Sequence, residues 1–215
     1  MPLRTSEAFI LRTYPLKETD RIVSFFTRDF GKKRGVARAA RRPKSKFGAS
    51  LEPLTQVRIQ FFERESRDLC SIDHCELLAS PLSARTNDLL NSVAISLIAE
   101  VADRMLPEAE VSDATYRLLA AATTALRTAP TAWLPLTYYL YWMVRLGGFL
   151  PILSITPEAE SLAQSIATSP LPTLQGDAAG AAGRELRRVL RAALEDHLEG
   201  ALRSWPILLT LEPAN

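Results

Sequence analysis

Positively charged side chains are concentrated in one segment of the chain. Residues 1–50 hold thirteen Lys or Arg against four Asp or Glu, a net charge of +9, whereas all 215 residues together carry +2 and the remaining 165 therefore carry −7. Nine of the thirteen fall between Arg28 and Lys46, where Asp29 is the only acid. Guanidinium and ammonium groups in such a run can neutralise successive phosphates, so the split predicts a polyanion partner for this segment. The alternative is a solvated basic loop without a ligand.

The candidate phosphate-binding side chains all come from this run. They are Lys32, Lys33, Arg34, Arg38, Arg41, Arg42, Lys44 and Lys46. Three nearby aromatic residues, Phe25, Phe26 and Phe47, would offer stacking faces to nucleobases if they were exposed. Core positions are the alternative for these rings, and we favour the core.

A second group of residues has the types that zinc prefers but not the expected spacing. Cys70, His74 and Cys75 would lie on a strand, where Cys70 and His74 share one face and Cys75 points to the other. No second ligand pair lies elsewhere in the chain. We therefore expect no metal and no other cofactor.

Catalytic constellations are missing from the sequence. Gly31-Lys32-Lys33 lacks the upstream glycine loop of a phosphate-binding motif, and neither G-x-S-x-G nor H-E-x-x-H occurs. His74 and His197 each follow an aspartate, but adjacent side chains diverge on strands and helices alike. No catalytic residue is nominated, and we expect the chain not to be an enzyme.

The elements that must position the basic run are short strands. Clean alternation of apolar and polar residues, or β-branched and aromatic runs, predict five of them. The expected strands are Glu7–Tyr14, Arg21–Thr27, Arg34–Ala37, Gln56–Phe62 and Leu69–Leu78. Five strands in so short a stretch, with the longest connection between the third and fourth, favour a small closed barrel of the OB type.

After residue 80 the apolar period changes to that of helices. We expect helices over Leu82–Leu106, Asp113–Arg127, Ala132–Leu146, Thr156 to about Thr168, and Arg184–Arg203, with a mobile linker over 169–183. The sequence thus predicts an α+β chain of two domains, an OB-fold barrel over 1–80 and an all-helical domain over 81–215.

Two observations bear on the compartment. Two cysteines cannot form a disulfide scaffold, and the first residues do not resemble a secretory signal, so the cytosol is expected. The apolar stretch from Ala132 to Leu153 carries Arg145 and a glycine pair, which favours a buried helix over a membrane span.

The basic run also carries a resemblance. Residues 39–48 read Ala-Ala-Arg-Arg-Pro-Lys-Ser-Lys-Phe-Gly and are followed by Leu51-Glu52-Pro53. Together with Glu7–Thr13, Glu18–Val23 and the stretch from Leu190 to Leu209, this pattern resembles the RecO family of bacterial DNA-repair and recombination mediators. Many members carry a four-cysteine zinc site after a Gly-Gly-Phe turn, but here Gly148-Phe149 continues to Thr156 without a cysteine. Zinc is therefore not inferred from the family.

The resemblance implies a non-catalytic protein with an OB-fold and a helical domain. Family members bind single- and double-stranded DNA, anneal complementary strands, and work with RecR to load RecA onto strands coated by single-strand-binding protein. A cytoplasmic, nucleoid-associated protein is implied.

Partner surfaces are expected on the helical domain, because the acidic part of the chain is poorly suited to be the principal DNA site. An acidic, phenylalanine-ended tail of single-strand-binding protein needs a hydrophobic slot beside a cation. Candidate cations are Arg145, Arg187, Arg188 and Arg191, whose alternative role is a solvated helix face. A non-enzymatic scaffold whose basic barrel docks on RNA or an acidic protein is the alternative function.

Overall fold

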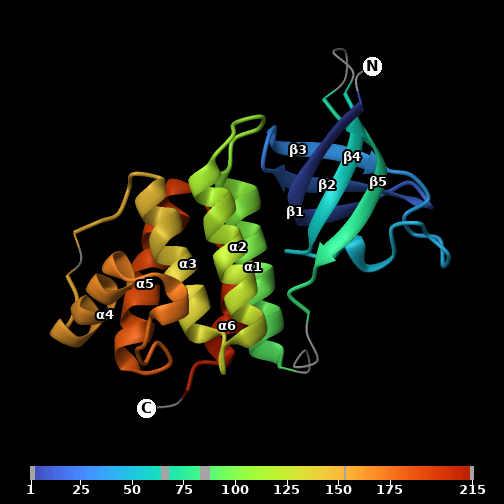
Figure 1. Ribbon diagram of the computed structural model, residues 1–215. Coiled ribbons are helices and arrows are strands. Elements are labelled where there is room, and N and C mark those ends of the chain that lie inside the picture. Colours follow the sequence, from blue (N-terminus) through green and yellow to red (C-terminus); the bar gives the residue numbers. More distant parts are fainter. Residues whose placement is uncertain (1–2, 64–67, 83–87, 153, 214–215) are drawn as a thin grey trace. The chain divides into compact units, whose positions relative to one another are not determined.

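The computed structural model describes residues 3–63, 68–82, 88–152 and 154–213, and it divides the chain into two compact units (Figure 1). The first unit contains residues 1–81 together with 99–116, and the second contains 82–98 together with 117–215. Residues 99–116 therefore group with the strands, although the sequence places them in the expected helical domain after residue 80. Each unit is considered separately below.

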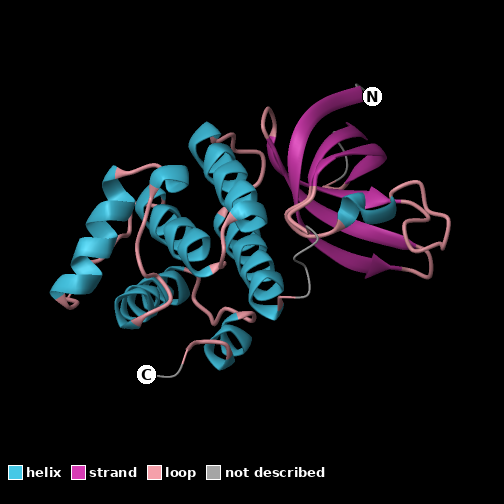
Figure 2. Cartoon of the chain, turned by 60° about the horizontal axis from the view of Figure 1, so that its bottom comes forward, coloured by secondary structure: helices cyan, strands magenta, loops and turns pink. Residues whose placement is uncertain are grey.

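The first unit is built on a closed barrel of five strands, which Figure 2 shows in magenta. The strands are β1 (Leu3–Leu16), β2 (Asp20–Thr27), β3 (Gly31–Ala37), β4 (Gln56–Phe62) and β5 (Cys70–Ala79). They close in the order β1-β2-β3-β5-β4, and only the β3–β5 pair is parallel. The predicted OB-type barrel is confirmed, and β4 has the predicted bounds.

The apolar character of both faces of β1 has a physical reason. Ala8 and Ile10 point into the barrel core, and the neighbouring Phe9 points outwards, yet Phe9 is fully buried. Its ring packs against Tyr116, with centroids 5.1 Å apart, and Phe26 of β2 lies 6.3 Å from the same tyrosine ring. Residues 99–116 thus cover an outer face of the barrel that the strands alone would leave exposed.

The barrel interior is closely packed with aliphatic and aromatic side chains. Phe25 and Phe61 meet edge to face at 5.5 Å, and Phe47 closes the core from the loop after β3 with 3% of its surface exposed. Phe25 and Phe26 are fully buried. The three phenylalanines near the basic run are therefore core residues and not stacking faces.

One expectation for β5 was wrong. Cys70 and Cys75 were expected on opposite faces, but both are buried in the barrel interior, and His74 is exposed. The register against β4 shifts between Gln60 and Phe61, which leaves Asp73 as an extra residue on β5. This β-bulge reverses the alternation, so positions five apart face the same side.

The helices are α1 (Leu89–Met105), α2 (Asp113–Thr128), α3 (Trp133–Leu146), α4 (Pro157–Thr168), α5 (Ala181–His197) and α6 (Trp205–Thr210). α1 and α2 each run from one unit into the other, while α3 to α6 belong to the second unit, where α3 and α4 pack against α5. The start of the first expected helix, residues 83–87, lies outside the described residues. Among the described helices, none combines the length and apolar character that crossing a bilayer requires.

The C-terminal helices differ from the prediction. The expected single helix over Arg184–Arg203 ends at His197, because Glu199 adopts a left-handed conformation with φ of 50° and Gly200 donates back to the Glu195 carbonyl. A short additional helix, α6, then starts with Pro206 in its first turn. The expected linker over 169–183 contains a 3-10 turn, Leu171–Thr173, and the first residues of α5.

Candidate nucleic-acid interface

The loop that follows β3 is held at its start by the β1–β2 turn. The Ala39 amide donates to the Asp20 carboxylate at 2.8 Å, and the Arg41 amide donates to the Thr19 carbonyl at 2.9 Å. The Arg41 guanidinium also donates to the Lys17 carbonyl at 3.2 Å. The bond from Ala39 lowers the pKa of Asp20, so this carboxylate remains charged at neutral pH and keeps its acceptor role.

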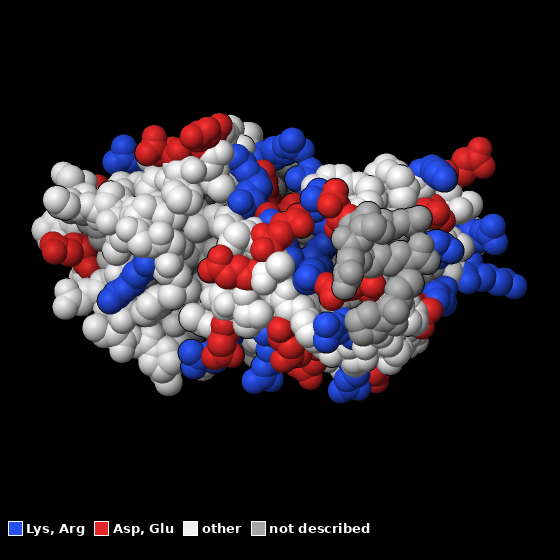
Figure 3. All heavy atoms as spheres, turned by 90° about the horizontal axis from the view of Figure 1, so that it is seen from above, with Lys and Arg blue, Asp and Glu red and all other residues white. Residues whose placement is uncertain are grey.

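The other end of this loop is fixed by the barrel core. Phe47 is buried among the core residues, and its carbonyl accepts hydrogen bonds from the amide and the hydroxyl of Ser50. Between these two attachments, Arg41, Arg42 and Lys44 are exposed. Lys and Arg side chains project at the right-hand edge of Figure 3, at the end of the barrel that carries this loop. The cations are therefore presented from a loop whose ends are anchored.

Besides Arg41, which donates to the Lys17 carbonyl, four of the eight sequence-predicted cations have partners within the first unit. Lys32 is partly buried and donates to the Asp103 carbonyl at 2.8 Å, and this burial lowers its pKa. The other three form ion pairs: Lys33 with Glu63 at 2.6 Å, Arg34 with Glu108 at 2.6 Å, and Lys46 with Asp73 at 3.6 Å. A phosphate would have to compete with these groups, so we expect little from them as DNA contacts.

The other four of the eight cations are the better candidates for phosphate contacts. Arg38, Arg41, Arg42 and Lys44 are exposed and make no ion pair with the residues that the structure describes. All four belong to the segment from the end of β3 to the middle of the loop. We call Arg38, Arg41, Arg42 and Lys44 the loop cations.

Sequence reasoning missed a second feature, on the outer face of the sheet next to the β1–β2 turn. Thr13 and Val23 are paired and Val23 points into the core, so the adjacent Tyr14 points outwards. Tyr14 is 37% exposed, and the Arg12 guanidinium carbon lies 4.8 Å from the centre of its ring. The sequence did contain a signal, since Arg12 and Tyr14 are two residues apart on a strand and hence share a face.

Two observations bear on metal binding and on the reactivity of the cysteines. Among the described residues, no three His, Cys, Asp or Glu side chains are placed to hold a metal ion. Burial raises the pKa of the Cys70 and Cys75 thiols to about 12, so both stay protonated at neutral pH and are poor ligands and nucleophiles. The absence of a metal and of catalysis nevertheless stays a prediction.

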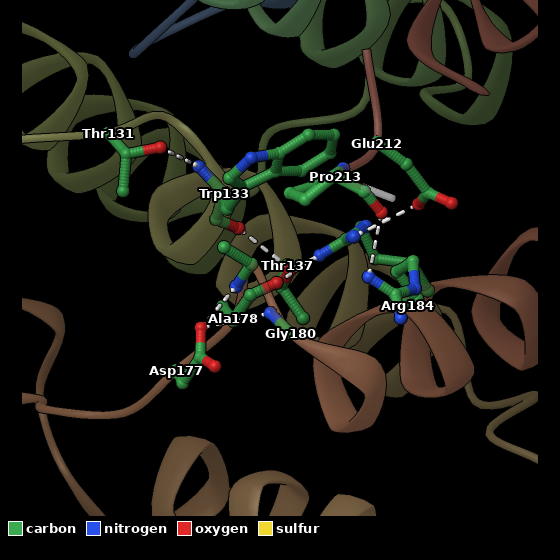
Figure 4. Close-up of polar contacts among 11 residues, drawn as sticks. Thr131, Trp133, Thr137, Asp177, Ala178, Gly180, Arg184, Glu212 and Pro213 are labelled. Carbon is green, nitrogen blue, oxygen red and sulfur yellow. Dashed lines mark hydrogen bonds and ion pairs between the residues drawn. The ribbon is translucent and has the colours of Figure 1, made fainter. Parts of the chain in front are cut away.

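Arg187, one of the four candidate partner contacts, is not on the surface. Its side chain is fully buried, pairs with Glu212 at 3.0 Å, and donates to Thr137 at 3.2 Å and to the Ala178 carbonyl. Its guanidinium carbon lies 4.2 Å from the centre of the Trp133 ring. Figure 4 shows these partners converging from α3, from the segment before α5 and from the C-terminal segment. The expected solvated or partner-binding role is wrong for Arg187, because a carboxylate far along the chain lets this charge be buried.

The other three candidate partner contacts remain accessible. Arg145 is exposed, lies 5.0 Å from the Trp142 ring centre and donates to the Tyr141 hydroxyl at 3.3 Å. Arg191 pairs with Glu195 at 2.9 Å, and Arg188 is exposed. A cavity of about 360 Å³ lies beside the latter two. It is lined by Arg184, Glu185, Arg188, Arg191, Trp205, Leu209 and Glu212.

The barrel with its basic loop, followed by a helical region, defines a protein of the OB-fold class with a helical C-terminal part. Residues 1–81 match the family described as Recombination protein O N terminal, and residues 86–156 match Recombination protein O C terminal. The chain belongs to the RecO family.

Curated relatives support this membership. A DNA repair protein RecO of Koribacter versatilis is 48% identical over 149 residues, covering 69% of this chain and 60% of the relative. The RecO of Bifidobacterium animalis is 42% identical over 127 residues, covering 59% and 52%. The RecO of Bifidobacterium adolescentis is 30% identical over 248 residues, covering 97% of this chain and the whole relative. The chain thus matches little more than half the length of the first two relatives and the full length of the third.

Proposed function

We propose that this chain is a non-catalytic DNA-binding recombination mediator in DNA repair, and that the loop cations are its main contact with the phosphate backbone. The observation that carries the proposal is the anchored loop with four exposed cations that form no ion pair among the described residues. The basic loop adjoins the β1–β2 turn. In OB-folds, the loop between the first two strands and the face of strands 2 and 3 commonly bind oligonucleotides. Membership of the RecO family supports the assignment to DNA repair and recombination.

The test is a titration of fluorescent single-stranded DNA at several salt concentrations. Neutralising about four to six phosphates predicts that log K falls with log salt at a slope of about −3 to −4. Reversing Arg41, Arg42 and Lys44 to Glu should weaken binding to all sequences and flatten this slope. A control reverses Arg127, an exposed arginine of α2, and should bind like the unaltered protein.

Two results would contradict the proposal. One is full affinity in the loop variant, and the other is a salt response that is flat in the unaltered protein. Salt-insensitive binding to an acidic protein, without DNA binding, would favour the scaffold function instead.

The finer activities are also proposed. By resemblance to the family, the chain binds single- and double-stranded DNA, anneals complementary strands, and acts with RecR to load RecA, in the bacterial cytoplasm and near the nucleoid. Strand annealing by the purified protein, and its association with RecR of the same organism, test these activities directly.

A tail of single-strand-binding protein is a further proposed partner. The cavity beside Arg188 and Arg191 supports this placement, because it combines cations with the apolar side chains of Trp205 and Leu209. Arg145 beside Trp142 is the second candidate surface. A tail peptide should bind the whole chain at low salt and bind the Arg188→Glu, Arg191→Glu variant more weakly. Absence of binding at low salt would exclude both surfaces.

A further inference from the structure

Tyr14 is more exposed than the other aromatic residues of the barrel. Phe9, Phe25, Phe26 and Phe61 are fully buried, Phe47 is 3% exposed, and Phe30 and Phe62 are partly exposed, whereas Tyr14 is 37% exposed. The buried rings are accounted for by packing within the first unit. Tyr14 lies outside the core cluster, on the outer face of the sheet.

Apolar neighbours extend the surface around Tyr14 across the sheet. Tyr14 of β1 is paired with Ile22 of β2, and Ile22 is paired with Val36 of β3. The next residues along β2 and β3, Val23 and Ala37, point into the core, so Ile22 and Val36 share the outer face with Tyr14. Both are partly exposed. The three side chains form one row, which we call the outer row.

Cations border the outer row at both ends. Arg12 lies over the Tyr14 ring, which holds the guanidinium against one side of the aromatic surface. Arg38, the first of the loop cations, comes two residues after Val36 at the end of β3. The turn that anchors the basic loop begins three residues after Tyr14, at Lys17. An aromatic ring with apolar neighbours is therefore placed beside groups that suit phosphates.

We propose that Tyr14 stacks on an unpaired nucleobase while the loop cations contact the neighbouring phosphates, which gives this protein a preference for single strands. The inference rests on the proposed DNA-binding function and deepens it. A flat ring can stack on any base, so the contact is independent of sequence. In a duplex the bases already stack on one another, so the ring has no base to contact and adds nothing to duplex affinity.

The experiment compares single-stranded and duplex DNA of the same length in the unaltered protein and in Tyr14→Ala, Tyr14→Leu and Tyr14→Phe. Loss of a stacked base predicts that Tyr14→Ala binds single strands about tenfold to a hundredfold more weakly. Duplex affinity should change less than about twofold, and the salt slope should stay the same because no phosphate contact is lost. Tyr14→Phe keeps the ring and should retain single-strand affinity, whereas Tyr14→Leu keeps only apolar surface and should behave like Tyr14→Ala.

The outcomes separate this inference from the proposed function. If Tyr14→Ala weakens single strands and duplex equally, or if Tyr14→Leu retains full affinity, stacking by Tyr14 is refuted although the loop cations still bind DNA. If the unaltered protein binds neither form of DNA, the proposed function fails and the inference fails with it. The melting temperatures of the variants are measured first, so that DNA affinities are compared only between folded proteins.

Discussion

Replacing Glu212 tests whether the buried Arg187 holds the C-terminal segment to the second unit. Arg187 has no exposed surface, and Glu212, 17% exposed, is its only carboxylate partner among the described residues. Removing one partner of a buried ion pair costs about 3–5 kcal/mol, because the other charge is left without compensation. Since water reaches part of Glu212, we expect the lower end, about 3 kcal/mol, for Glu212→Ala. Glu212→Gln keeps an acceptor oxygen and should cost about 1.5–3 kcal/mol.

Tryptophan fluorescence during urea unfolding is the appropriate assay. All three tryptophans of the chain, Trp133, Trp142 and Trp205, lie in the second unit, so the signal reports that unit alone. With an m-value of about 1–3 kcal/mol/M in urea, a loss of 3 kcal/mol lowers the midpoint urea concentration by roughly 1–3 M.

A double-mutant cycle isolates the pair from the other contacts of Arg187. The double variant Arg187→Met, Glu212→Ala should be less destabilised than the sum of the single variants, because neither charge is then left unpaired. A cost below about 0.5 kcal/mol for Glu212→Ala, the range of ordinary surface substitutions, would refute the reasoning. Strict additivity in the cycle would refute it as well.

Two further predictions concern the first unit. Gly31 has φ of 67°, and a Cβ atom there would collide with the backbone of Glu110. Gly31→Ala should therefore destabilise the barrel by about 1–3 kcal/mol through backbone strain, and the collision should add to this cost. Unfolding followed by circular dichroism measures the loss of stability. An unchanged unfolding curve would contradict this. The hydrogen bond from the Ala39 amide lowers the pKa of Asp20. The Asp20 carboxylate therefore stabilises the loop fully at pH values above 3.8, the ordinary pKa of an aspartate. This stabilisation is lost as the pH falls through the lowered pKa. Asp20→Asn should speed amide exchange in the loop already at neutral pH, and equal exchange rates in both proteins would show that the carboxylate does not hold the loop.

The sequence predicted the barrel well because local patterns decide most of it. β4 has the predicted bounds because its alternation is uninterrupted, and α4 is bounded by a proline at its start. The bulge in β5 was missed because no residue type marks the extra Asp73, and only the register against β4 reveals it. Local signals therefore located the elements, whereas pairing with a distant strand decided which way Cys75 points.

The sequence identified the basic run but not which of its cations are paired. Lys33, Arg34 and Lys46 pair with carboxylates that lie 27 to 74 residues away along the chain. Arg187 shows the same limit, since its partners Thr137 and Glu212 are 50 and 25 residues away. Which charges remain available to a ligand depends on such long-range pairs, and a single sequence does not show them.

The grouping of residues 99–116 with the strands has a consequence for how the protein is made. A nascent chain that has just completed β5 contains all five strands but still exposes Phe9 and Phe26, because Tyr116 has not yet been synthesised. The parallel bridge between Lys32 and Glu108 is missing at that stage too. The outer face of the barrel is therefore covered only after α1 and the residues up to Tyr116 have been translated. A fragment that ends at residue 81 exposes these aromatic side chains to solvent and is prone to aggregate.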